Sequence, residues 1–132
     1  MIRRLKRDEQ GAAAVEMALA LPVLIIFIYG IFQIGMVMAA SAGMQHALGE
    51  GARLATIYPY PNDATVKTRI ENKIFGTYIG NYTVDDPADL KNGVGTTYAK
   101  DLRVTYTVTP NFLFFTAPPI TLVRTKRVYL SF

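Results

Sequence analysis

The chain has no cysteine and only one histidine, His46, among its 132 residues. Without cysteine, neither a disulfide framework nor a thiolate metal site can form. A single histidine makes a histidine-based metal site or a histidine-dependent catalytic triad improbable within one chain. No nucleophile–base pattern and no phosphate-binding loop is present either. We therefore expect a protein that is not an enzyme and has no metal and no cofactor.

Charge is missing from one long stretch, residues 17–44, where 28 consecutive positions lack Asp, Glu, Lys and Arg. About 20 apolar residues suffice for a helix to cross the hydrocarbon core of a bilayer. The run therefore predicts one transmembrane helix, with the lipid bilayer as its surroundings. Glu16 stands directly before the run. An acid costs about 2.5–3.5 kcal/mol at the centre of a membrane helix and less near its edge, so Glu16 is expected to have a partner.

The distribution of the remaining charges predicts an orientation. Arg3, Arg4, Lys6 and Arg7 all precede the apolar run. The positive-inside rule then puts the N-terminus in the cytoplasm and the C-terminal part outside. Residues 45–132 carry a dispersed net charge of +3, which is too weak a basic signal to predict nucleic-acid binding.

Proline and glycine divide the chain into three segments. Residues 1–11 form a short basic leader, residues 12–58 a long helix, and residues 59–132 a small ectodomain. Pro59 and Pro61 are expected to end the long helix. A second helix is predicted over residues 62–76, capped by Asn62 or Asp63. The expected fold class is α+β: a long N-terminal transmembrane helix continuing into an ectodomain with a second helix and a short antiparallel sheet.

Alternation of apolar and polar residues predicts the strands. It is clear over residues 102–108, and we expect an antiparallel pair from residues 100–109 and 120–131, with a third strand near 80–84. Residues 85–93 predict a loop with at most one helical turn, in which Asp85, Asp86 and Asp89 are solvated rather than calcium ligands. The apolar side chains of Phe112, Phe114 and Phe115 are expected to fill the core.

The segment Gly11-Ala-Ala-Ala-Val-Glu16-Met-Ala-Leu-Ala-Leu-Pro22-Val-Leu, with Gly30 and Gly35 after it, resembles TadE-like pseudopilins of the tight-adherence (Tad/Flp, type IV-related) pilus system. Gly51-Ala-Arg-Leu-Ala55 also resembles a segment of that family. The resemblance covers about residues 11–55.

The resemblance implies cleavage after Gly11 by a prepilin peptidase. Ala12 then becomes the first residue and Glu16 the fifth. Glu16 would pair with the free amine of a neighbouring subunit and set the axial register of assembly. The implied partners are other pilin and pseudopilin subunits and the inner-membrane assembly platform. The implied location is the bacterial inner membrane, with a periplasmic C-terminal domain, or an extracellular pilus after incorporation.

Two departures favour a minor subunit over the shaft protein. Major pilins of this system are short and usually carry Tyr after the glutamate. In this chain Met17 follows Glu16, and about 75 residues follow the long helix.

Small residues recur at every fourth position of the long helix: Ala39, Gly43, Ala47, Gly51 and Ala55. Small residues let two helix backbones approach closely. For Ala39 and Gly43 we favour packing against helices of neighbouring subunits. For Gly51 and Ala55, packing against a neighbour and packing against the chain's own ectodomain remain equal alternatives. Arg53, a recurring feature in the resembling segment, is expected to pair with Glu50 or a carbonyl and to anchor the helix to the β region.

Two alternative functions remain open. The first is an uncleaved, single-pass membrane-anchored binding or sensory module. The second is a secreted protein, because Ala40-Ser41-Ala42 fits the small-x-small pattern of signal peptidase cleavage after Ala42. The apolar run before that site, residues 17–38, is 22 residues long and exceeds the 7–15 usual for a signal peptide.

Overall fold

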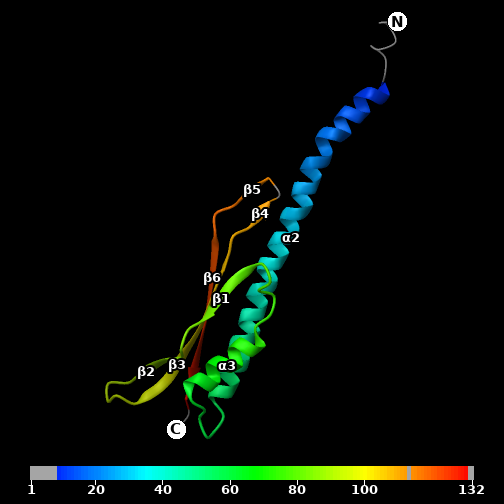
Figure 1. Ribbon diagram of the computed structural model, residues 1–132. Coiled ribbons are helices and arrows are strands. Elements are labelled where there is room, and N and C mark those ends of the chain that lie inside the picture. Colours follow the sequence, from blue (N-terminus) through cyan, green and yellow to red (C-terminus); the bar gives the residue numbers. More distant parts are fainter. Residues whose placement is uncertain (1–8, 113, 131–132) are drawn as a thin grey trace, which may run out of the picture.

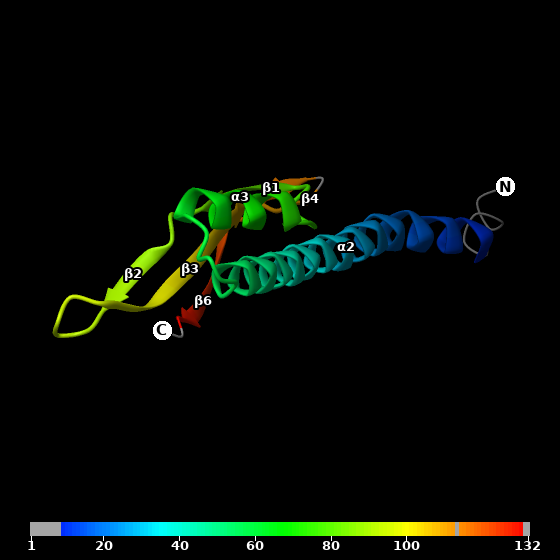
Figure 2. The same cartoon turned by 90° about the horizontal axis from the view of Figure 1, so that it is seen from below.

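The computed structural model describes residues 9–112 and 114–130. A long helix, α2 (Glu9–Ala55), is followed by a shorter one, α3 (Asp63–Lys73), and then by strands only. Figure 1 shows α3 and the sheet beside the C-terminal half of α2, while the N-terminal end of α2 projects beyond them. The turned view in Figure 2 shows the same arrangement. The predicted α+β fold, with its long apolar helix, second helix and antiparallel sheet, is confirmed.

The long helix was predicted over residues 12–58. Helix α2 begins before that range and ends before residue 58. It already includes Glu9, because alanines after Gly11 favour helix and carry it through the glycine. It continues through Pro22 and ends at Ala55. Beyond Ala55, the Thr56 hydroxyl donates to the Arg53 carbonyl at 2.9 Å. Pro59 also disfavours helical backbone in the residue before it, so the last predicted turn does not form.

Helix α3 begins at a side-chain cap. The Asn62 carboxamide oxygen accepts hydrogen bonds from the Thr65 backbone N–H at 2.8 Å and from its hydroxyl at 2.6 Å. The helix ends at Lys73, three residues earlier than predicted, because Ile74 is extended. Gly76 then adopts φ +75°, where a Cβ would lie 2.6 Å from the Ala39 carbonyl of α2. Glycine is therefore required at this close approach of loop and helix.

Strand β3 (Thr97–Val108) is the centre of the sheet. Strand β6 (Ile120–Tyr129) pairs antiparallel along one edge, with Val104 opposite Arg124. Strand β1 (Gly80–Val84) pairs with the second half of β3 along the other edge, with Val84 opposite Val104. The predicted pair of long strands and the predicted third strand are thus confirmed.

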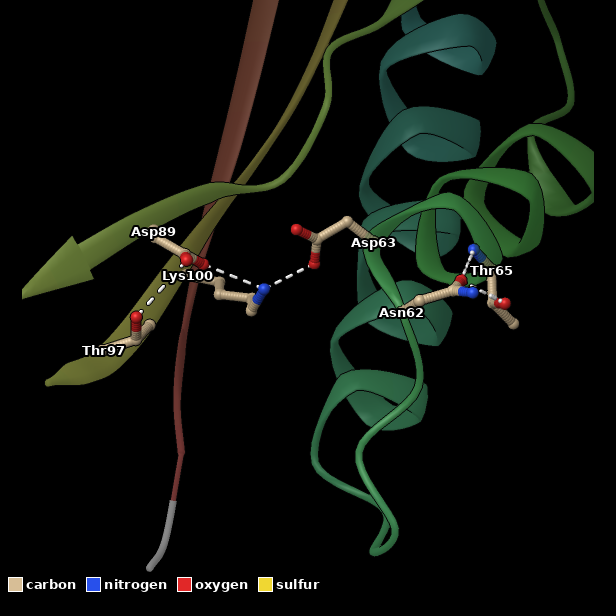
Figure 3. Close-up of polar contacts among 6 residues, drawn as sticks. All are labelled: Asn62, Asp63, Thr65, Asp89, Thr97 and Lys100. Carbon is tan, nitrogen blue, oxygen red and sulfur yellow. Dashed lines mark hydrogen bonds and ion pairs between the residues drawn. The ribbon is translucent and has the colours of Figure 1, made fainter.

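Strand β2 (Ala88–Lys91) lies where a loop was predicted, and that prediction is wrong. Its backbone pairs with the first half of β3, with Asp89 opposite Lys100. The Lys100 ammonium also reaches Asp63 at the start of α3 at 2.5 Å, and Asp89 at 2.9 Å (Figure 3). Cross-strand pairing stabilises β2, although its own residues are poor strand formers.

One hydrophobic core joins α2, α3 and the sheet. Alternate residues of β3 point into it, which confirms the alternation seen over residues 102–108. The core side chains come from all three layers: Ala40, Met44, Ala47, Leu48, Ala52 and Ala55 of α2, Val66 and Ile70 of α3, and Val84, Leu102, Val104, Tyr106, Val108 and Val128 of the sheet.

The predicted phenylalanine core is wrong for two of its three members. Strands β4 (Asn111–Phe112) and β5 (Phe115–Thr116) form a small hairpin separate from the main sheet. Phe112 is partly buried, whereas 72% of Phe114 and 56% of Phe115 are exposed. The main core is already filled by side chains of α2, α3 and β3, so the hairpin extends beyond it along α2 (Figure 1).

Candidate processing and assembly site

The N-terminal half of α2 is an apolar rod with little intramolecular cover, and residues 11–25 are exposed at every position. Large hydrophobic side chains from Val15 to Met38 are exposed on it. By length and composition, α2 is the one helix in the described part of the chain that can cross a membrane. Exposing this many apolar side chains to water is unfavourable, so this half of α2 is suited to a membrane anchor.

Glu16 lies on this rod and is exposed. It borders a shallow apolar groove along the helix, lined also by Leu19, Ala20, Val23, Leu24 and Phe27. It makes no hydrogen bond or ion pair with residues 9–112 or 114–130. A carboxylate in apolar surroundings gains from a cationic partner, and the described residues supply none to Glu16.

Gly11 and Ala12 are also exposed, and both are helical. The bond between them therefore lies inside α2, not in an extended segment before the helix. Glycine is about 1 kcal/mol worse than alanine in a helix, so Gly11 marks the weakest point of this first described turn. Access for a peptidase requires that turn to open.

The small-residue stripe packs against the chain's own α3 and the loop after it. A Cβ at Gly43 would lie 1.9 Å from the Phe75 carbonyl oxygen, and one at Gly51 would lie 2.4 Å from Ile70. Ala47 and Ala55 are buried in the core, and Ala39 contacts Gly76. Since this face is occupied within the chain, a partner helix can pack on it only by displacing α3.

Arg53 contacts its own helix rather than the β region. Its guanidinium lies 3.6 Å from the Glu50 carboxylate, one turn earlier, and 64% of its side chain is exposed. Glu50 makes a shorter ion pair, 2.8 Å, with Arg69 of α3. The hydrogen bond from Arg69 is the main cause that lowers the pKa of Glu50. Among the described residues, the ion pair that joins α2 to another element is thus Glu50–Arg69.

Two polar contacts between α2 and the strands β4 and β6 were not predicted from the sequence. The Gln33 side-chain amide donates to the Asn111 carbonyl of β4 at 3.1 Å, and only 7% of Gln33 is exposed. The Arg124 guanidinium of β6 donates to the Ser41 hydroxyl at 2.9 Å. For the first contact the sequence offered one signal: Gln33 is the one amide side chain between positions 17 and 44.

The aspartates after β1 are held by separate cations. Asp85 pairs with Arg103, Asp86 with Lys67, and Asp89 with Lys100. Within the described ranges no three acidic or histidine side chains gather as a metal site would require. They form ion pairs between neighbouring elements.

Comparison with known proteins identifies the helical segment. Residues 11–53, about a third of the chain, match the family model of TadE-like proteins. This confirms the resemblance read from the helix sequence. No curated protein and no solved structure matches the chain. The matched range contains Gly11, Glu16 and most of the small-residue stripe, and ends within the last turn of α2.

Proposed function

Residues 11–53 are TadE-like, and from this premise we propose that the chain is a minor pseudopilin-like subunit of a Tad-type pilus. The family match indicates a function related to the Tad pilus, and the finer role is our inference. In the proposed role, α2 is inserted in the bacterial inner membrane, the leader lies in the cytoplasm and the ectodomain lies in the periplasm. A prepilin peptidase cleaves after Gly11, and the subunit then takes part in initiating or assembling the pilus.

The observation that carries the proposal is Glu16, exposed among apolar side chains. After cleavage, Ala12 would present a free amine four residues before it. The ammonium group of one subunit can then neutralise the Glu16 carboxylate of the next. Such pairing offsets the cost of burying the acid and fixes the axial register between subunits.

The packing of the ectodomain argues against the secreted alternative. Cleavage after Ala42 would remove Ala40, which is fully buried in the core. It would also remove Ser41, which accepts a hydrogen bond from Arg124. The product would lose part of the folded core and the contact of the sheet with α2.

A permanent membrane anchor is the second candidate function. One observation favours it: helical structure extends from Glu9 through Gly11 and Ala12. If that turn stays closed, the peptidase cannot reach its bond and the leader remains attached. Binding or sensing would then be the work of the ectodomain.

The N-terminus of the protein recovered from its native membrane distinguishes these functions. Intact mass and terminal sequencing are expected to show Ala12 as the first residue. An intact Met1 would establish the permanent anchor instead, and a chain beginning at Gly43 would establish secretion.

Substitution of the acid tests its proposed role. Glu16→Gln keeps the shape of the side chain but removes the charge that pairs with the amine. We expect normal cleavage and a large loss of this variant from sheared pilus fractions relative to membranes. The matched control is Glu71→Gln, at an exposed acid of α3 outside the membrane segment. Incorporation of Glu16→Gln at the level of the unsubstituted protein would exclude the register mechanism.

A further inference from the structure

One end of the ectodomain is built from segments without charged side chains. Residues 74–84 and 104–123 contain no Asp, Glu, Lys or Arg. These segments include β1, the second half of β3 and the β4–β5 hairpin, which lie toward the exposed half of α2 (Figure 1). Lys67, Arg69 and Lys100, which form ion pairs, lie outside these segments, on α3 and the first half of β3. The uncharged end is thus the one that faces the apolar rod.

The β4–β5 hairpin holds exposed phenylalanines at this end. Phe112 and Phe115 stack with ring centroids 5.0 Å apart. Phe112 also approaches Gly30, where a Cβ would lie 3.4 Å from its ring. Gln33 fixes the hairpin to α2 through its hydrogen bond to Asn111. Phe114 and Phe115 are left with most of their surface exposed.

Helix geometry gives the depth of this hairpin. With Glu16 at one edge of the hydrocarbon core, about 20 residues bring α2 to the other edge near Met36. At 1.5 Å per residue, Gln33 then lies about 5 Å and Gly30 about 9 Å inside that edge. Amphipathic segments bound at a membrane surface bury their apolar side to a depth of about 5–10 Å. The hairpin contacts α2 at this depth.

We propose that the β4–β5 hairpin inserts Phe114 and Phe115 into the lipid interface on the ectodomain side of the membrane. The inference rests on the proposed anchoring of α2, and the occupant is lipid. An exposed apolar cluster continuous with an apolar helix is stabilised by burial in acyl chains. The unpaired backbone groups of so short a hairpin still need water or headgroups. This requirement limits insertion to the interface.

Aromatic substitution gives a direct measurement, because the chain has no tryptophan. Phe114→Trp would be the single reporter in the full chain, reconstituted in phosphatidylethanolamine–phosphatidylglycerol vesicles containing brominated phosphatidylcholine. We expect blue-shifted emission and strong quenching, greatest for bromine near the carbonyl end of the acyl chain. Phe114 is 72% exposed, so the substitution leaves the core intact.

Two further single-tryptophan variants separate the possible failures. Phe27→Trp reports on the middle of the proposed span and is expected to be quenched most by bromine near the methyl end. Val94→Trp, at a 90% exposed position in the loop between β2 and β3, is the matched control and is expected to remain unquenched.

Each outcome has one meaning for the proposal. Quenching of Phe27→Trp without quenching of Phe114→Trp would overturn the hairpin inference and leave the anchor intact. Absence of quenching in both would overturn the anchor, and the inference with it. Blue-shifted but unquenched emission from Phe114→Trp would show that protein, such as a second copy of the chain, covers the hairpin, and this too would overturn lipid contact.

Discussion

At the scale of single residues, the glycines of α2 serve different purposes. Gly43 and Gly51 lie where α3 and the loop after it come closest to the long helix. Gly49, between them in the chain, has only the Lys126 ammonium nearby, 3.9 Å from a would-be Cβ. The spacing of small residues is therefore accounted for by folding within the chain. A bulky substitution at Gly43 would disrupt the ectodomain and cannot isolate contacts between subunits.

The contrast between two of these glycines gives a stability prediction. Gly43→Ala would force its new methyl group against the Phe75 backbone and should lower the unfolding free energy by about 1–3 kcal/mol, as overpacking does. Gly49→Ala meets no such obstacle and should raise it by about 0.5–1 kcal/mol, because alanine favours helix. Urea unfolding of the full chain in detergent micelles measures both. Equal stability of the two variants would contradict the close contact.

At the scale of elements, ion pairs tie the ends of helices and strands together. Lys100 of β3 connects the start of α3 to β2 through Asp63 and Asp89 (Figure 3). Burial disfavours the charged form of Lys100, but its hydrogen bonds to the two carboxylates outweigh this and raise its pKa. The hydrogen bond from Lys100 in turn lowers the pKa of Asp89. Across β3 and β6, the Arg127 guanidinium similarly lowers the pKa of Asp101.

These shifts predict a loss of stability in acid. Asp89 and Asp101 have folded-state pKa values below the ordinary 3.8, so the unfolded chain takes up protons first as the pH falls. Their contribution is complete above about pH 4 and is lost as the pH falls through the folded-state pKa values. Lys100, whose pKa is raised, keeps its contribution up to about pH 10.5 and loses it above that.

The acid dependence can be assigned with one substitution and a control. Asp89→Asn should lower stability at neutral pH and flatten the fall in acid, measured by urea unfolding at a series of pH values. Asp86→Asn is the control, because 81% of that side chain is exposed and exposed ion pairs contribute little. An unchanged acid limb in Asp89→Asn would show that this pair does not stabilise β2.

At the scale of the whole molecule, the long helix is both anchor and core. Its N-terminal half is exposed and apolar, and its C-terminal half supplies six of the buried core residues. The ectodomain is consequently not complete without α2. Polar contacts join α2 to three other elements: Gln33 contacts β4, Ser41 contacts β6, and Glu50 contacts α3.

This shared core predicts how fragments behave. A fragment of residues 59–132 lacks every core side chain of α2 and should show no cooperative unfolding transition. A fragment of residues 31–132 keeps those side chains and Gln33, and should unfold cooperatively in mild detergent. Urea titrations followed by circular dichroism distinguish the two. Cooperative unfolding of the shorter fragment would refute the shared core.

The sequence by itself determined the elements whose signals are local. The uncharged run predicted the long helix, a cap at Asn62 or Asp63 predicted the start of α3, and alternation predicted β3. These patterns arise from the geometry of one helix or strand, so neighbouring residues carry them. The motif from Gly11 to Glu16 is local as well, and for that reason the TadE-like segment was recognisable without a structure.

The tertiary structure decided what covers each apolar face. Periodicity marks a face as apolar but says nothing about which distant segment packs on it. Only the structure shows that the small-residue stripe packs against α3 and the loop after it. It also shows that Glu50 pairs with Arg69 and that β2 forms by pairing with β3. Phe114 stays exposed because other side chains fill the core first. These outcomes depend on contacts between residues far apart in the chain, which local sequence does not encode.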